Sequence, residues 1–211
     1  DYDIWLEQLG WEDTCNQDIP PEEELPEYDV TAVFNVTNTT APTALCHSGM
    51  TSAFTEMYVD GVQVNVTSGY TFSTFGEHTV NYMLKNNTIL TGSSFSGLFT
   101  NCTSLEEIVI TDSVTTIGDK VFQNCSSLRK ITLGNGVTKV GTSTSSIFAQ
   151  PVFSGCTNLR EITCLATTAP TLTSKAFNGI QNNGGVLFVP LGSDYSSWTN
   201  VLTTWTIQYK T

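Results

Sequence analysis

The feature that most constrains this 211-residue chain is a 23-residue repeat in its second half. Apolar residues recur at that spacing in five pairs: Cys102 and Cys125, Leu105 and Leu128, Ile108 and Ile131, Val114 and Val137, and Ile117 and Val140. A third copy begins at Phe153, offset by 31 residues from Phe122. A repeat of this length is typical of solenoids, in which each coil buries the apolar face of its neighbour.

The repeat unit F-x-x-C-x-x-L-x-x-I-x-I-x-x-x-V-x-x-I-G predicts a coil that enters a short strand. Such strands stack in parallel about 4.8 Å apart, so the fold class is mainly β, with a parallel sheet of stacked 23-residue coils. The longer offset of the third copy places a loop over residues 142–150, after which Phe153 rejoins the column below Phe122.

A different pattern precedes the repeats. Residues 30–36 alternate apolar and polar positions, and Asp60-Gly61 separates two strand-like runs, which is the strongest short hairpin signal. We therefore expect an acidic N-terminal segment over 1–29, a small antiparallel β domain that caps the repeats over 30–85, and a repeat domain over 86–211. Its last part, 176–211, is expected to form a C-terminal cap.

Charge excludes several classes of partner. Residues 1–29 hold eleven Asp and Glu and no Lys or Arg, which leaves nine acidic and eight basic residues for the rest of the chain. Without a basic cluster, nucleic acid is not an expected partner. No apolar run is long enough to span a membrane as a helix.

The stretch FTNCTSLEEIVITDSVTTIG resembles the BspA-like leucine-rich repeats of Bacteroides-type bacterial surface proteins. The stretches FGEHTVNYML before the repeats and VLFVPLGSDYSSW after them are also similar to parts of such proteins. The resemblance implies a short leucine-rich-repeat solenoid at the cell surface or outside the cell. It also implies adhesion or recognition of a host or bacterial protein, and export as an outer-membrane lipoprotein whose anchor is not in this sequence.

The cysteines are expected to be structural. Cys102, Cys125 and Cys156 share one inward position of the repeat, and Cys164 falls at another. Buried small apolar residues are the favoured interpretation, with a disulfide between stacked coils as the alternative. Cys15 and Cys46 could pair with each other. No C-x-x-C motif occurs, so no metal site is expected.

Enzymatic alternatives have little support, and we expect neither a cofactor nor a catalytic residue. Cys46 and His47 adjoin, but in a strand their side chains point to opposite faces. Glu107 and Glu161 occupy one outward position in two copies, roughly 10 Å apart, which keeps a glycoside hydrolase as a remote alternative. Lys130 stands between them, and a Glu-Lys-Glu ladder explains the pattern better.

Four aromatic residues near the C-terminus allow two interpretations: Tyr195, Trp198, Trp205 and Tyr209. They could cover the apolar face of the last coil, or they could form an exposed platform on which sugars stack. The second interpretation belongs to the alternative function, a glycan-binding surface module.

The leading functional hypothesis places recognition on the outward side chains of the repeat strands. These form columns across neighbouring strands, namely Glu107, Lys130 and Glu161; Val109, Thr132 and Thr163; and Thr111, Gly134 and Leu165. Mixed polar and apolar side chains on a rigid backbone suit a broad protein contact better than a catalytic pocket. The first two columns are the predicted binding residues.

Overall fold

The computed structural model describes residues 27–86, 89–90, 96–142 and 151–211. The helices are η2 (Ser48–Ala53) and α2 (Ser196–Thr199), and no helix in these ranges is long and apolar enough to cross a membrane. The strands are β1 (Val30–Val36), β2 (Thr43–Ala44), β3 (Phe54–Val59), β4 (Val62–Val64), β5 (Gly69–Tyr70), β6 (Gly76–Leu84), β7 (Ile89–Leu90), β8 (Leu105–Ile110), β9 (Thr116–Ile117), β10 (Lys130–Leu133), β11 (Lys139–Val140), β12 (Glu161–Cys164), β13 (Thr171–Leu172), β14 (Gly185–Pro190) and β15 (Trp205–Lys210).

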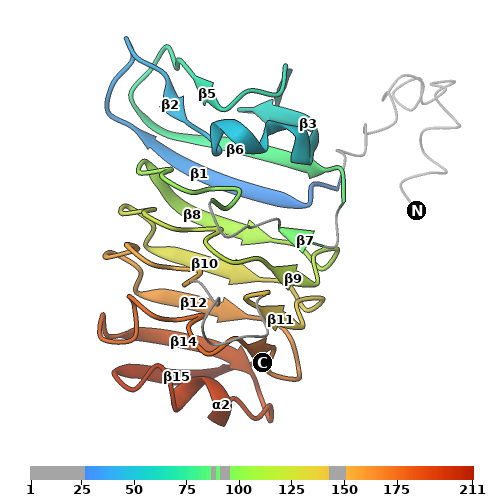
Figure 1. Ribbon diagram of the computed structural model, residues 1–211, viewed down its shortest axis with the longest axis vertical. Coiled ribbons are helices and arrows are strands. Elements are labelled where there is room, and N and C mark those ends of the chain that lie inside the picture. The colour runs from blue at the N-terminus through green and yellow to red at the C-terminus, as the bar shows by residue number, and fades with distance from the viewer. Residues whose placement is uncertain (1–26, 87–88, 91–95, 143–150) are drawn as a thin grey trace, which may run out of the picture.

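Nine of the described strands form one sheet, in the order β15-β14-β12-β10-β8-β1-β6-β3-β4 (Figure 1). The strands from β8 to β15 in this sheet are parallel, whereas β1, β6, β3 and β4 pair antiparallel. The short strands β7, β9, β11 and β13 form a second parallel sheet, and β2 pairs with β5. The predicted fold class, a solenoid preceded by an antiparallel unit, is confirmed.

A column of stacked phenylalanines runs through the interior of the coils. From Phe99 through Phe122 and Phe153 to Phe177, successive ring centroids lie 5.8, 5.5 and 5.9 Å apart. All four rings are at most 1% exposed. Phe153 therefore rejoins the column next to Phe122, and the predicted register across the 31-residue offset is confirmed.

Left-handed backbone positions recur with the same spacing at one corner of the coils. Asn101, Asn124, Gly155 and Gly179 have φ values of 66°, 61°, 82° and 101°. The Nδ2 of Asn124 donates a hydrogen bond of 2.9 Å to Oδ1 of Asn101. Asparagine and glycine are the residues that accept this conformation most readily, which explains their place at the corner.

The antiparallel unit continues the repeat sheet at its N-terminal end. β1 pairs with β6 on one side and with β8, the first repeat strand, on the other. The β3–β4 hairpin turns at Asp60 and Gly61, whose φ values of 49° and 80° confirm the predicted tight turn. Tyr82 of β6 lies edge-on to Phe99, 5.4 Å between centroids, and closes this end of the phenylalanine column.

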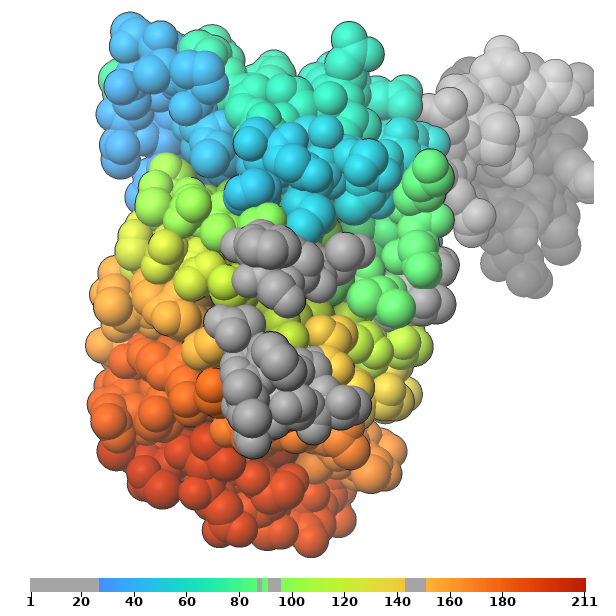
Figure 2. Space-filling view, viewed as in Figure 1, coloured from blue at the N-terminus to red at the C-terminus, as the bar shows by residue number. Residues whose placement is uncertain are grey.

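Asp29 connects the antiparallel unit to the first coil. Its side chain is 8% exposed, and its two carboxylate oxygens accept hydrogen bonds from Leu84 N at 2.7 Å and from Ser113 Oγ at 2.6 Å. The backbone oxygen of Asp29 also accepts a bond of 3.1 Å from Thr111 N. In the space-filling view, the antiparallel unit (blue to cyan) and the coils below it pack directly against one another (Figure 2).

The C-terminal aromatic residues cover the last coil. Tyr195, Trp198 and Trp205 are 1%, 0% and 8% exposed, and their polar hydrogens bond to backbone carbonyls at 2.7, 2.8 and 3.1 Å. Trp198 lies edge-on to Phe177, 4.9 Å between centroids. The capping interpretation is confirmed for these three. Because only Tyr209 is open, at 52% exposure, the four rings do not form a platform for sugars.

Candidate functional site: the outer face of the nine-stranded sheet

Alternate side chains of the large sheet point away from the core, and we call this surface the outer face. Backbone register aligns two columns of side chains across seven strands. One contains Thr79, Val33, Glu107, Lys130, Glu161, Val186 and Thr206, and the other contains Asn81, Thr31, Val109, Thr132, Thr163, Phe188 and Gln208. The register therefore brings the six predicted binding residues together on adjacent strands.

Exposure varies along the predicted columns. Val109 is 42% exposed near the middle of the sheet, and the neighbouring Thr132 is half-buried. Thr163 is only 6% exposed, and it lines a small apolar cavity of about 160 Å³ beside Phe188 and Lys210. Nζ of Lys210 lies 3.8 Å from the centre of the Phe188 ring. Thr163 thus contributes less accessible surface than the other members.

A β-bulge brings two carboxylates onto the outer face. The register between β1 and β8 shifts after Val33. Val33 faces Glu107, but the next residue, Phe34, faces Leu105, so one residue of β8 has no partner in β1. Glu106 is the extra residue, and both it and Glu107 are half-buried rather than alternating between core and solvent. Bulges of this kind redirect a side chain at the place where pairing is irregular.

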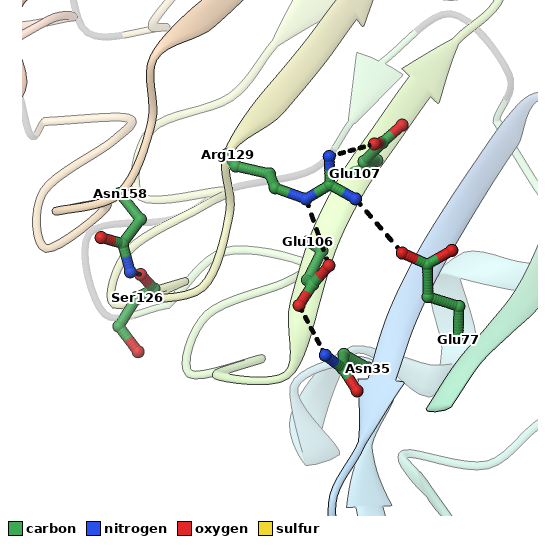
Figure 3. A network of polar contacts seen from close by, with 7 residues as sticks. All are labelled: Asn35, Glu77, Glu106, Glu107, Ser126, Arg129 and Asn158. Atoms are coloured by element: carbon green, nitrogen blue, oxygen red, sulfur yellow. Dashed lines mark hydrogen bonds and ion pairs between the residues drawn. The ribbon is translucent and has the colours of Figure 1, made fainter. Parts of the chain in front are cut away.

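Arg129 binds both of these carboxylates and a third from the antiparallel unit (Figure 3). Its Nε lies 3.1 Å from Glu106, and its two terminal nitrogens lie 2.6 Å from Glu107 and 3.2 Å from Glu77. The hydrogen bond to Glu106 is the main cause of a raised pKa of Arg129. Asn35 of β1 donates a further bond of 2.8 Å to Glu106. This network joins the first coils to the antiparallel unit across the sheet surface.

Sequence reasoning missed this network, although a signal was present. Glu106 and Arg129 are 23 residues apart, the repeat spacing, so an acid and a base occupy one position in neighbouring coils. Arg129 precedes β10, and Glu106 lies at the bulge in β8, so the alternation of inward and outward side chains does not place either of them on the outer face.

The expected Glu-Lys-Glu ladder is found in register, with one difference in pairing. Lys130 Nζ lies 3.3 Å from Glu161, whereas the ion pair of Glu107 is with Arg129. Neither glutamate lines the cavity beside Phe188 or the cavity beside His47. Two carboxylates already engaged by cations on an open sheet are poorly placed for general acid and base work.

The assignment of Cys46 and His47 to a strand is wrong, because they form a turn that leads into η2. The Cys46 thiol donates to the Thr67 carbonyl at 3.7 Å, and His47 Nδ1 accepts from the Gly49 N–H at 3.2 Å. Burial raises the pKa of Cys46 to about 12. The thiol is therefore protonated at neutral pH and is not an activated nucleophile.

The repeat cysteines are inward-facing, as predicted. Cys102, Cys125, Cys156 and Cys164 are free thiols with 0% exposure. Two of them donate to phenylalanine carbonyls of the preceding coil, Cys125 to Phe99 at 3.1 Å and Cys156 to Phe122 at 3.0 Å. Cys46 is also free, and Cys15 lies outside the described residues. Within those residues, no cluster of three His, Cys, Asp or Glu is arranged to hold a metal ion.

Comparison with known proteins agrees with this geometry. The family model described as "BspA type Leucine rich repeat region (6 copies)" matches residues 52–150. The match begins within η2 and ends before Phe153, whereas the phenylalanine column continues to Phe177. No match was found among curated proteins or among solved structures. Leucine-rich repeats generally mediate protein interactions, and those of the BspA type are typically surface-associated. From the repeat register and this match, the chain carries leucine-rich repeats of the BspA type over residues 52–150.

Proposed function

We propose that this chain is a non-catalytic recognition or adhesion module of a bacterial cell surface, and that it binds a protein partner through its outer face. The observation that carries the proposal is the sheet itself. Nine strands present one continuous surface, with exposed Val109 near its centre and ion-paired side chains beside it. An apolar centre within a polar surround is the usual composition of a protein interface.

Rigidity of the outer face supports the same proposal. Arg129 holds three carboxylates, and Lys130 is paired with Glu161, so the charged side chains are positioned before a partner arrives. Side chains that are already ordered lose less conformational entropy on binding. Because the surface carries both signs of charge, the partner should present complementary groups of both signs around an apolar contact.

The repeat class supports a proposal for the location as well. We propose that the chain is displayed outside the cell as part of an outer-membrane lipoprotein, with the anchor elsewhere in the protein. Protease treatment of intact cells that produce the protein would test this. Digestion of the chain without lysis is expected, and protection until lysis would contradict the location.

Charge reversal at Lys130 tests the binding surface. K130E removes the ion pair with Glu161 and places a third carboxylate in that column, so partner affinity should fall by about tenfold, the effect of roughly 1.4 kcal/mol. Each exposed cross-strand pair contributes only about 0.2–1 kcal/mol, so thermal unfolding should change little. Partners would first be captured from an extracellular-matrix protein extract, and their affinities then measured by surface plasmon resonance.

The matched control is K175E, which makes the same charge change at a turn residue outside the outer face that is half-buried, as Lys130 is. Partner affinity of this control should equal that of the unmodified chain. Equal losses in K130E and K175E would indicate a general charge effect, and unchanged affinity in K130E would argue against the proposed surface.

A further inference from the structure

A second candidate site lies where the antiparallel unit meets the first coil. A cavity of about 350 Å³ opens there between β2, the start of η2, the start of β5 and the turn that precedes β8. This volume falls at the lower end of the range of about 300–1,000 Å³ for small-ligand sites. None of the lining residues belongs to the two columns of the outer face.

The wall of the cavity is polar but uncharged. It presents hydroxyl groups from Ser48 and Ser68, the carboxamide of Asn101 and the imidazole of His47. The Thr100 hydroxyl is already engaged, because it donates to Lys120 O at 2.9 Å and accepts from Gly97 N at 2.8 Å. No Asp, Glu, Lys or Arg lines it. An ionised ligand would find no opposite charge there, and a wholly apolar ligand would leave these polar groups without partners.

Two of these groups are held in place by hydrogen bonds to residues outside the cavity wall. His47 Nδ1 accepts from the Gly49 N–H at 3.2 Å, so the neutral ring carries its hydrogen on Nε2 and can donate from there. Asn101 Oδ1 accepts from Asn124 Nδ2 at 2.9 Å, which leaves the two hydrogens of its own amide for a ligand. The backbone of Asn101 is fixed in the left-handed corner, with φ of 66°.

We propose that this cavity binds a neutral saccharide unit. Sugar hydroxyls are both donors and acceptors, so they match a wall of hydroxyl, carboxamide and imidazole groups. Pro42 and Ala44 add apolar contacts for the C–H surface of a sugar ring. Peptide recognition relies instead on sheet edges, apolar anchor pockets or charged groups. The saccharide site is separate from the protein-binding surface proposed above and does not depend on it.

Nuclear magnetic resonance titration of the full ¹⁵N-labelled chain tests this proposal. The neutral probes are N-acetylglucosamine, galactose and mannose with their β-linked disaccharides, and galacturonic acid is the charged counterpart. At least one neutral probe should shift the amide signals of residues 44–48, 68–69 and 100–101 in a saturable manner, and galacturonic acid should not. Absence of such shifts for every neutral probe would overturn the proposal.

Two glycine substitutions provide the matched comparison. N101G removes a carboxamide of the wall at a position where glycine fits the backbone, and N124G breaks the same Asn–Asn hydrogen bond outside the wall. Affinity for the neutral probe should fall by about fivefold in N101G, the effect of one hydrogen bond. It should fall by less in N124G, which keeps the carboxamide and removes only the bond that orients it. Equal affinities in the two variants would contradict the site.

A peptide titration distinguishes a saccharide site from a peptide site. Peptides from a gelatin digest should leave the same amide signals unshifted. If the peptides shift these signals and the sugars do not, the cavity is a peptide site and the saccharide proposal fails. Binding of a protein at the outer face should be the same in N101G as in the unmodified chain, so the two proposals succeed or fail separately.

Discussion

At the residue scale, stacking restricts which side chain each coil can carry. The corner positions illustrate this, because Asn124 lies over the next corner residue, Gly155. A Cβ atom added to Gly155 would come within 2.5 Å of Asn124 Oδ1 and 3.0 Å of Asn124 Cα. Asparagine is accepted in the first two coils, but the third coil requires glycine, both for its φ of 82° and for space.

Substitution of Gly155 tests this restriction. G155A should lower the free energy of unfolding by about 2–3 kcal/mol, since left-handed strain and a steric clash act together. The matched variant is G192A, where φ is 81° but no atom lies within 4 Å of the added Cβ. It should cost only about 1 kcal/mol. Chemical denaturation measures both values, and equal losses would show that the contact with Asn124 has no effect.

The interior thiols give a second prediction at this scale. Burial raises the pKa values of Cys102 and Cys125 well above their usual range, so these thiols are protonated as well as inaccessible. A thiol reagent should fail to label the native chain at Cys102, Cys125, Cys156 and Cys164 and should label all four in denaturant. C125A should cost about 1 kcal/mol, because it leaves a small cavity. Native labelling, or a disulfide among the four found by mass spectrometry, would contradict this assignment.

At the element scale, two connections between successive coils begin alike. The first connection reads Gly118-Asp119-Lys120-Val121-Phe122, and the second reads Gly141-Thr142, then 143–150, then Pro151-Val152-Phe153. Residues 143–150 lie outside the described residues. Thr142 N donates to Asp119 Oδ1 at 3.0 Å, so the two connections begin in the same register.

Deletion of residues 143–150 should therefore restore the ordinary 23-residue spacing. Pro151 would then take the place of Lys120, whose φ is 58°, and proline is restricted to φ near −65°. The deletion combined with P151K should unfold with a free energy within about 1 kcal/mol of the unmodified chain, since loop length has a small effect. The deletion alone should be several kcal/mol less stable. If the deletion combined with P151K failed to fold, the proposed register would be wrong. If the deletion alone were as stable as the deletion with P151K, proline would not be excluded from the position of Lys120.

Periodicity in the sequence was enough to predict much of the fold. Cys125 and Phe153 were placed in the interior correctly because their positions recur in each repeat. The hairpin at Asp60-Gly61 was predicted correctly because the residue types of a tight turn determine its conformation locally. The surface network of Arg129 was not predicted, because the bulge at Glu106 depends on how β1 meets β8. The turn at Cys46 was not predicted, because a short polar stretch has no hydrophobic periodicity by which a strand could be distinguished from a 3₁₀ helix.

At the scale of the whole molecule, one sheet extends from the antiparallel unit to the C-terminal cap. Asp29, which is buried, and Arg129, whose side chain is 47% exposed, add polar contacts to the strand pairing that joins the antiparallel unit to the coils. The phenylalanine column ends edge-on against Tyr82 and Trp198, so the chain closes its apolar interior at both ends. We propose that a protein partner binds the outer face rather than either capped end.

Site-specific photo-crosslinking tests that claim most directly. A p-benzoyl-phenylalanine placed at Val109, which is 42% exposed on the outer face, would be compared with one at Val201, which is 37% exposed near the C-terminal cap. The partner captured from the matrix extract would be irradiated with each full-length variant, and the products resolved by mass spectrometry. We predict a crosslink from position 109 and none from position 201. A crosslink from position 201 alone would contradict recognition through the outer face.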